Sequence, residues 1–230
     1  MRINKYIASC GIASRRKADQ LIETGKIAVN GDKILEPGYK VQESDIVTYC
    51  GEIISPVKEK YYLMLNKPID YVCTNDDPFA KKTVFDLIDI DAKLFSIGRL
   101  DKDSRGLLLI TNDGDLYNKL MHPSKLIFKK YKVILDKSFD KKHIKQLSEG
   151  VDIGGYVTSQ AKIQCTNDRK ILYIEISEGK NRQVRRMFKA FNYQVVDLER
   201  VAIDKIQLGQ LPIGKYRYLT NEEVQYLSSL

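Results

Sequence analysis

The first fifty residues show two helical patterns followed by a pair of short strands. Apolar positions in "MRINKYIASCG" recur at helical spacing and predict a short helix over residues 1–11. The segment 14–25, "SRRKADQLIETG", predicts a second helix, with Ser14 as its N-cap and a glycine at its end. In residues 26–35, "KIAVNGDKIL", the Asn30–Gly31 pair predicts a tight hairpin turn.

The pattern changes after "CGEIISPVKEK", where glycine, proline and a charged run indicate a linker. Strand patterns then occur at residues 61–68, 106–112, 129–135 and 171–179, and helical patterns at residues 115–123, 141–150 and 182–191. These strands are not spaced like regular strand–helix–strand repeats. We therefore expect two domains, residues 1–58 and 59–230, and an α+β fold with a mixed, largely antiparallel sheet in the second.

Composition places the chain among ordinary globular proteins. Of its 230 residues, 43% are hydrophobic and 30% are charged, which does not fit a disordered protein. The apolar runs are too short to span a membrane, and the N-terminus has no apolar leader segment, so we expect a cytoplasmic protein. Four scattered cysteines and two histidines argue against a zinc site.

The net charge of +8 favours a polyanionic partner if the cations cluster. Arg15, Arg16 and Lys17 fall in the first turn of the second predicted helix, where the helix dipole disfavours cations by a few tenths of a kcal/mol each. A phosphate docked on this helix terminus would make them favourable. The alternative is a solvated basic face.

The segment "GRLDKDSRGLLLITNDGDL" places Asp101 between Arg99 and Lys102, just before an apolar strand. This carboxylate could be a loop solubiliser, a metal ligand or a reactive group. The spacing imitates the start of a calcium loop, but Arg105 occupies the third ligand position and Asn112 stands at the twelfth position in place of the bidentate glutamate, which excludes that interpretation. A carboxylate on a loop held by a rigid strand can act as a base, an acid or a nucleophile, and a cationic partner would keep it ionised.

Two further segments combine cations with possible recognition chemistry. "EGKNRQVRRM" is a loop entering a helix, and it contains Lys180, Arg182, Arg185 and Arg186. Arginine suits phosphate and carboxylate groups, although a solvated helix face would show the same pattern. In "FKKYKVIL", Tyr131 stands among lysines, an arrangement that favours stacking of a base, although a core position is the alternative.

Together these segments resemble the RsuA/RluB type of ribosomal RNA pseudouridine synthase. The segment "GRLDKDSRGLLLITNDGDL" looks like the family signature. "YYLMLNKPIDYVC" looks like the opening strand motif of the family, and "SEGKNRQVRRMF" looks like its late basic motif. Residues 1–58 resemble the alpha-L RNA-binding motif of the ribosomal S-four type. The resemblance covers nearly the whole chain in the order of the family, and it implies an RNA-binding domain followed by a catalytic domain.

The resemblance implies isomerisation of a uridine in ribosomal RNA without cofactor or metal, because nothing is oxidised and no group enters or leaves. Asp101 matches the essential aspartate, Tyr131 the stacking aromatic, and Arg185 the cation expected to pair with Asp101. Asp101 would attack the sugar, attack the base or remove a sugar proton, and these routes stay open. We assign RNA binding to Arg15, Arg16, Lys17, Arg99, Lys102, Lys129, Lys180, Arg182 and Arg186.

Two other functions remain as alternatives at this point. A non-catalytic RNA-binding protein of ribosome assembly would keep the fold but would not need Asp101 within an intact motif. A glycosidase would need a second carboxylate, for which Asp103 is the nearest candidate. We expect a monomer that binds ribosomal RNA and does not associate with membranes.

Overall fold

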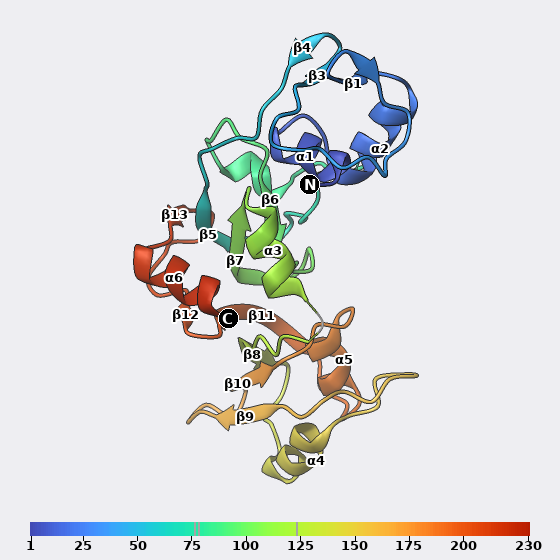
Figure 1. Ribbon diagram of the computed structural model, residues 1–230. Helices are drawn as coiled ribbons and strands as arrows, with labels where there is room; N and C mark the ends of the chain where they lie inside the picture. Colours follow the sequence, from blue (N-terminus) through green and yellow to red (C-terminus); the bar gives the residue numbers. More distant parts are fainter. Residues whose placement is uncertain (76, 78, 123) are drawn as a thin grey trace. The chain divides into compact units, whose positions relative to one another are not determined.

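The helical pattern at the start of the chain and the strand-rich pattern after Tyr61 belong to separate compact units. The computed structural model describes residues 1–75, 77, 79–122 and 124–230 (Figure 1). Unit 1 comprises Met1–Tyr61 with residues 91–93 and 112–114, and unit 2 comprises the rest. The expected boundary after residue 58 lies just before this division. Within the described residues, no helix is long and apolar enough to cross a membrane.

Unit 1 is built from two helices and a small sheet. Helices α1 (Ile3–Ser9) and α2 (Arg15–Glu23) pack by their buried apolar faces, and Ser14 caps α2 by accepting a hydrogen bond from the Lys17 amide. Over residues 1–61, all of which are described, four strands pair in the order β2–β1–β3–β4: β1 (Ile27–Val29), β2 (Asp32–Lys33), β3 (Val47–Tyr49) and β4 (Glu52–Ile53). Positive φ angles of 54° at Asn30 and 92° at Gly31 form the tight turn, which confirms the predicted hairpin.

The first turn of α2 contains Arg15, Arg16 and Lys17, which we call the first-turn cations. All three are exposed, and this turn contains no acidic residue. The predicted placement of these side chains on a helix N-terminus is thus confirmed.

Unit 2 is organised around one long sheet. In the described part of the chain, nine strands form this sheet, with the main order β13–β5–β7–β11–β8–β10–β9, while β6 pairs with β7 and β12 with β11. Their bounds are β5 (Tyr62–Lys67), β6 (Phe95–Ile97), β7 (Arg105–Thr111), β8 (Lys129–Leu135), β9 (Lys162–Cys165), β10 (Ile171–Ile176), β11 (Val195–Ile203), β12 (Ile206–Gln207) and β13 (Tyr216–Tyr218). The β7–β11 pair is parallel and the other pairs are antiparallel, which confirms the expected mixed, largely antiparallel sheet.

Helices cover the sheet in two groups that make two apolar cores. Helices α3 (Gly114–Met121) and α6 (Asn221–Ser229) pack with β5 and β7, whereas α4 (Ile144–Glu149) and α5 (Gln183–Lys189) pack with β8, β10 and β11. Short 3-10 helices lie at Val84–Leu87 and Lys141–His143. The strands and helices predicted in this unit are present within a few residues, and Pro123, at the end of one predicted helix, lies outside the described residues. The sequence pattern did not predict helix α6 or the strands β6, β9, β11, β12 and β13.

The two halves of the sheet join where β7 meets β11. Arg105 and Gly106 pair there with Glu199 and Arg200. A Cβ atom on Gly106 would lie 2.4 Å from the Arg200 carbonyl oxygen, and Gly106 has a φ of 104°. Only glycine fits this close backbone approach. The junction positions the loop of residues 98–104, which enters β7 directly.

Candidate active site

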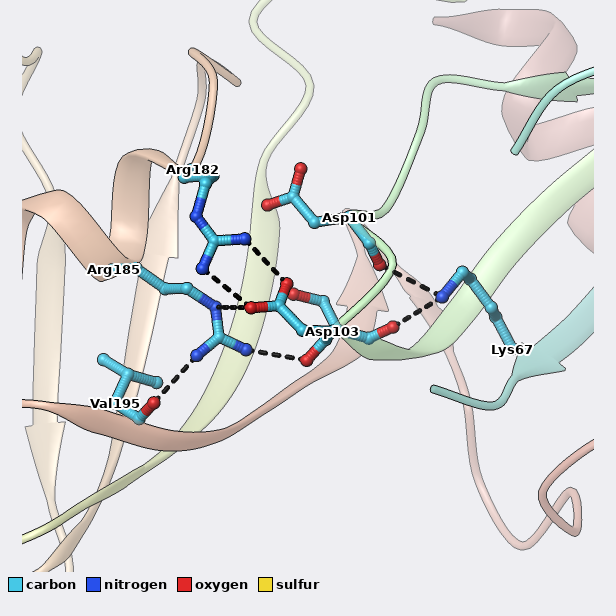
Figure 2. A network of polar contacts seen from close by, with 7 residues as sticks. Lys67, Asp101, Asp103, Arg182, Arg185 and Val195 are labelled. Atoms are coloured by element: carbon cyan, nitrogen blue, oxygen red, sulfur yellow. Dashed lines mark hydrogen bonds and ion pairs between the residues drawn. The ribbon is translucent and has the colours of Figure 1, made fainter. Parts of the chain in front are cut away.

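Asp101 lies in the loop between β6 and β7, at the edge of this junction. The Ser104 amide donates a hydrogen bond of 3.0 Å to the Asp101 carbonyl, which closes a turn within the loop. The half-buried Asp101 carboxylate makes no hydrogen bond or ion pair with any described residue (Figure 2). Arg99 and Lys102, which flank it in the sequence, are both exposed. The loop therefore offers an unengaged carboxylate between two exposed cations.

A buried lysine holds this loop from the side of β5. Lys67 is 0% exposed, and its ammonium donates hydrogen bonds to the carbonyls of Pro68 (3.0 Å), Asp101 (3.1 Å) and Ser104 (2.7 Å). Burial lowers the pKa of the Lys67 ammonium, and Cys73 and Asp103 oppose this shift. The ammonium thus fixes the backbone on both sides of the turn, including the carbonyl of Asp101 itself.

Two arginines hold the same loop from the side of α5, and both contact Asp103. Arg182 donates to the Asp103 carboxylate through Nη1 (2.9 Å) and Nη2 (2.7 Å). Arg185 places Nε 3.3 Å from Asp103 Oδ2 and donates from Nη2 to the Asp103 carbonyl at 2.7 Å. The hydrogen bonds from Arg182 lower the pKa of Asp103, and the charge of Arg185 contributes to this shift.

These contacts correct the predicted pairing of Arg185 with Asp101. The remaining Nη1 of Arg185 donates to the Val195 carbonyl at 2.8 Å, so all three nitrogens of the guanidinium face acceptors other than Asp101. Figure 2 shows the Asp103 carboxylate between the two arginines and the Asp101 carboxylate to one side of them. The turn between residues 101 and 104 directs the two carboxylates apart, and sequence spacing does not reveal this direction.

The other cations of the late basic motif are also engaged by the protein. Arg186 donates to the carbonyls of Ile153 and Gly154, and Lys180 lies over the Tyr156 ring at 4.4 Å from its centroid. Arg182 stands before α5 with a φ of 50°. Arg182 and Lys180 remain exposed, so they combine a protein contact with access to solvent.

Tyr131 and Lys129 lie on β8, and both are more buried than the sequence suggested. Tyr131 is 8% exposed and belongs to the same apolar core as Leu100, the residue before Asp101. Lys129 is half-buried and donates to the Ser177 carbonyl at 3.2 Å, and burial lowers its pKa. Tyr131 is therefore packed as a core residue, although 8% of its surface remains exposed.

Arg200 is a site residue that the sequence analysis missed. It lies on β11 directly opposite Tyr131 on β8, and it is 3% exposed. Its Nε donates to the Leu107 carbonyl at 2.7 Å and its Nη1 to the Arg99 carbonyl at 3.5 Å, while Nη2 has no hydrogen-bond partner among the described residues. Arg200 thus places a buried positive charge between the predicted aromatic platform and the start of the Asp101 loop.

This arrangement suits nucleophilic or proton-transfer chemistry by a single carboxylate on an anionic substrate. The loop backbone is fixed by buried cations, which is the preorganisation that such chemistry requires. No cluster of three or more potential metal ligands is present among the described residues. The surrounding positive charges would attract a phosphate backbone toward Asp101.

Comparison with known proteins assigns this site to a family. The family model described as RNA pseudouridylate synthase matches residues 61–190, and a model of the S4 domain matches residues 1–47. The chain belongs to the RNA pseudouridine synthase family. The resemblance seen in its motifs is thus confirmed, as is the order of an S4 domain and a synthase domain.

Relatives of this synthase align along almost its whole length. "Ribosomal large subunit pseudouridine synthase B" of Bacillus subtilis (strain 168) is 39% identical, and the alignment covers 100% of this chain and 96% of that protein. "Dual-specificity RNA pseudouridine synthase RluF" of Escherichia coli (strain K12) is 38% identical, with 97% and 77% covered. A crystal structure of a pseudouridylate synthase superposes with a TM-score of 0.72 at 31% identity and covers 99% of both chains.

Three residues that hold the loop of residues 98–104, Lys67, Asp103 and Arg200, are not among the site residues predicted from the sequence. Lys67 ends a buried apolar strand and precedes a proline, which is an unusual place for a lysine and a signal that could have identified it. The sequence offers Asp103 only as the second carboxylate of a glycosidase. Arg200 lies in the charged segment "DLER", which carries no comparable signal of burial.

Proposed function

We propose that this pseudouridine synthase isomerises a uridine of ribosomal RNA with Asp101 as its reactive carboxylate. The observation that carries the proposal is that Asp101 alone of the two loop carboxylates is unengaged, while its backbone is held by Lys67. The name of the Bacillus subtilis relative supports a ribosomal substrate. No feature of the site favours a non-catalytic RNA-binding role.

The reaction breaks the bond between uracil N1 and the ribose C1′ and forms a bond between uracil C5 and the same C1′. The C5 proton leaves and N1 gains a proton, so the atoms of substrate and product are the same. Asp101 contributes by attacking the sugar or the base, or by removing a sugar proton. In each of these routes the Asp101 carboxylate reacts in its ionised form.

RNA would bind through the exposed cations of each unit. In unit 2, Arg99 and Lys102 flank Asp101 and would contact phosphates beside the target nucleotide. A paired uridine must be flipped out of its stack at a cost of a few kcal/mol, and we propose that Tyr131 contacts the flipped base. In unit 1, the first-turn cations and the free amides of α2 would bind a phosphate. We propose that the chain works as a cytoplasmic monomer.

The test compares wild type with Asp101→Asn on ribosomal RNA transcripts. We expect nucleoside mass spectrometry to detect pseudouridine with wild type and none with Asp101→Asn, while the affinity for RNA persists. Asp140→Asn is the control for the loss of one negative charge, because Asp140 is an exposed aspartate of unit 2 that is ion-paired with Lys142 and lies outside the loop of Asp101. Undiminished product from Asp101→Asn would refute the assignment, and an RNA-binding wild type that forms no product would refute the proposed function.

A further inference from the structure

Asp103 links two segments that are far apart in the sequence. It belongs to the reactive loop, whereas Arg182 and Arg185, which it contacts, lie about 80 residues later, at and just after the start of α5. Its carboxylate receives a two-pronged pair of hydrogen bonds from Arg182, the strongest geometry available to an arginine and a carboxylate. Each prong is shorter than 3 Å, so the contact is well formed although both side chains are partly exposed.

The Nε atom of Arg185 interacts with the charge of the Asp103 carboxylate and makes no hydrogen bond to it. Its Nε is buried and lies 3.3 Å from Asp103 Oδ2, but the geometry does not satisfy a hydrogen bond. This nitrogen is therefore stabilised by the negative charge alone. Without that charge, a largely buried guanidinium would lose its counter-ion while keeping its two carbonyl contacts.

The contacts of Asp103 complement those of Lys67. Lys67 fixes the carbonyls of Asp101 and Ser104, on the two sides of the turn, from the direction of β5. Asp103 fixes the middle of the turn from the direction of α5, so the backbone of Asp101 is held between two independent supports (Figure 2). Neither support uses the Asp101 carboxylate, which stays available to react.

We infer that Asp103 is a positioning residue of the synthase: through Arg182 and Arg185 it sets the place of the Asp101 carboxylate in the site. Asp103 does not touch the reacting atoms in this role. A displacement of the reactive group by about 1 Å can cost on the order of 100-fold in rate. The inference rests on the proposed function for its kinetic consequence, but the fixing of the loop can be measured without catalysis.

The test uses Asp103→Asn, which removes the charge and keeps the shape, Arg182→Gln, which removes the guanidinium group, and the double variant, all in the full-length chain. We expect single-turnover pseudouridine formation to slow by on the order of 10- to 100-fold in each single variant. The double variant should be no slower than the slower single variant, because both changes break one pair. The dissociation constant of Asp103→Asn for RNA should not increase, because a negative charge is removed.

Hydrogen exchange supplies a readout that does not depend on activity. The Ser104 amide, which donates to the Asp101 carbonyl, should exchange faster in Asp103→Asn than in wild type. Asp140→Asn is the control for both measurements, since Asp140 is 48% exposed against 46% for Asp103 and is ion-paired with Lys142 at 3.0 Å. We expect Asp140→Asn to match wild type in the rate of pseudouridine formation and in the exchange rate of the Ser104 amide.

Three outcomes would overturn the inference. The first is a rate for Asp103→Asn within twofold of wild type. The second is a rate reduction in the double variant that equals the product of the rate reductions in the two single variants. The third is a slow Asp103→Asn variant with unchanged Ser104 exchange, because this would place Asp103 in the chemistry itself. A wild type that forms no pseudouridine would refute the proposed function, whereas the exchange comparison would still decide whether Asp103 fixes the loop.

Discussion

Replacement of Lys67 by methionine tests whether the loop of residues 98–104 is held by a buried charge. Methionine has nearly the same length as lysine and no charge, so the substitution removes the hydrogen bonds to Pro68, Asp101 and Ser104 without leaving a large cavity. Loss of a hydrogen bond to a charged group costs about 1.5–3 kcal/mol. The variant also avoids the desolvation of a buried ammonium, which offsets part of this loss.

The net effect on stability follows from these opposing terms. We expect the free energy of unfolding to fall by about 2–4 kcal/mol, with the hydrogen bonds outweighing the desolvation. For a chain of this size that corresponds to a fall in Tm of roughly 5–15 °C. The rate of pseudouridine formation should fall as well, because the Asp101 carbonyl loses one of its supports.

Urea unfolding and calorimetry measure the first effect. The control is Lys145→Met, because the Lys145 side chain is 82% exposed and should change the free energy of unfolding by less than about 0.5 kcal/mol. If Lys67→Met lowered the free energy of unfolding by no more than Lys145→Met does, the buried ammonium would not stabilise the loop and the reasoning would be wrong.

The pH dependence gives an independent check of the same residue. Burial places the pKa of Lys67 below its unfolded value of about 10.4. Between those two pKa values the unfolded chain binds more protons at this site than the folded chain, so wild-type stability rises with pH there. The difference in unfolding free energy between wild type and Lys67→Met should therefore grow as pH approaches about 10.4. A difference that is constant or shrinks over this range would contradict the assigned direction.

Two further predictions concern the sheet junction and the first-turn cations. Gly106→Ala should lower the free energy of unfolding by more than about 3 kcal/mol, since its Cβ would meet the Arg200 backbone at 2.4 Å and its φ is positive. Gly114→Ala, where a Cβ meets open space, is the control in the same unfolding assay, and equal effects would disprove the close-approach argument. Alanine at all three first-turn cations should weaken RNA binding and reduce the slope of log affinity against log salt by about 2–3. An unchanged slope in a salt titration would mean that α2 does not contact phosphates.

Local sequence patterns determined most of the elements of this protein. The Asn30–Gly31 turn depends on the conformational freedom of adjacent residues, and the structure contains it as predicted. The apolar run of β7 and the alternation of β8 also identify strands, because burial on two faces or on one face leaves a direct trace in the sequence. The motifs were sufficient to identify the family, since their order and spacing survive whatever the tertiary contacts are.

Elements with weaker local signals needed the tertiary structure. Strand β11 is the longest strand of the described sheet, yet three of its nine residues are charged and its pattern does not stand out. Partners far away in the sequence accommodate its charges: Arg105 on β7 binds Asp197 and Glu199, and the buried Arg200 donates to the Leu107 carbonyl of β7. Helix α6 begins with a capping box formed by Thr220 and Glu223, which is a sequence signal for a helix start.

The site shows the same division between local and long-range information. Sequence motifs selected Asp101 and gathered the cations, because residue type and spacing suffice to suggest a reactive carboxylate. They did not determine the partner of Arg185, which lies 82 residues from Asp103 in the chain and contacts it only in the folded structure. Which of two carboxylates two residues apart meets an arginine depends on the direction of a turn and on the packing of α5. The tertiary structure alone decided that Asp103 is bound and Asp101 is free, because such directions follow from the sum of many distant contacts.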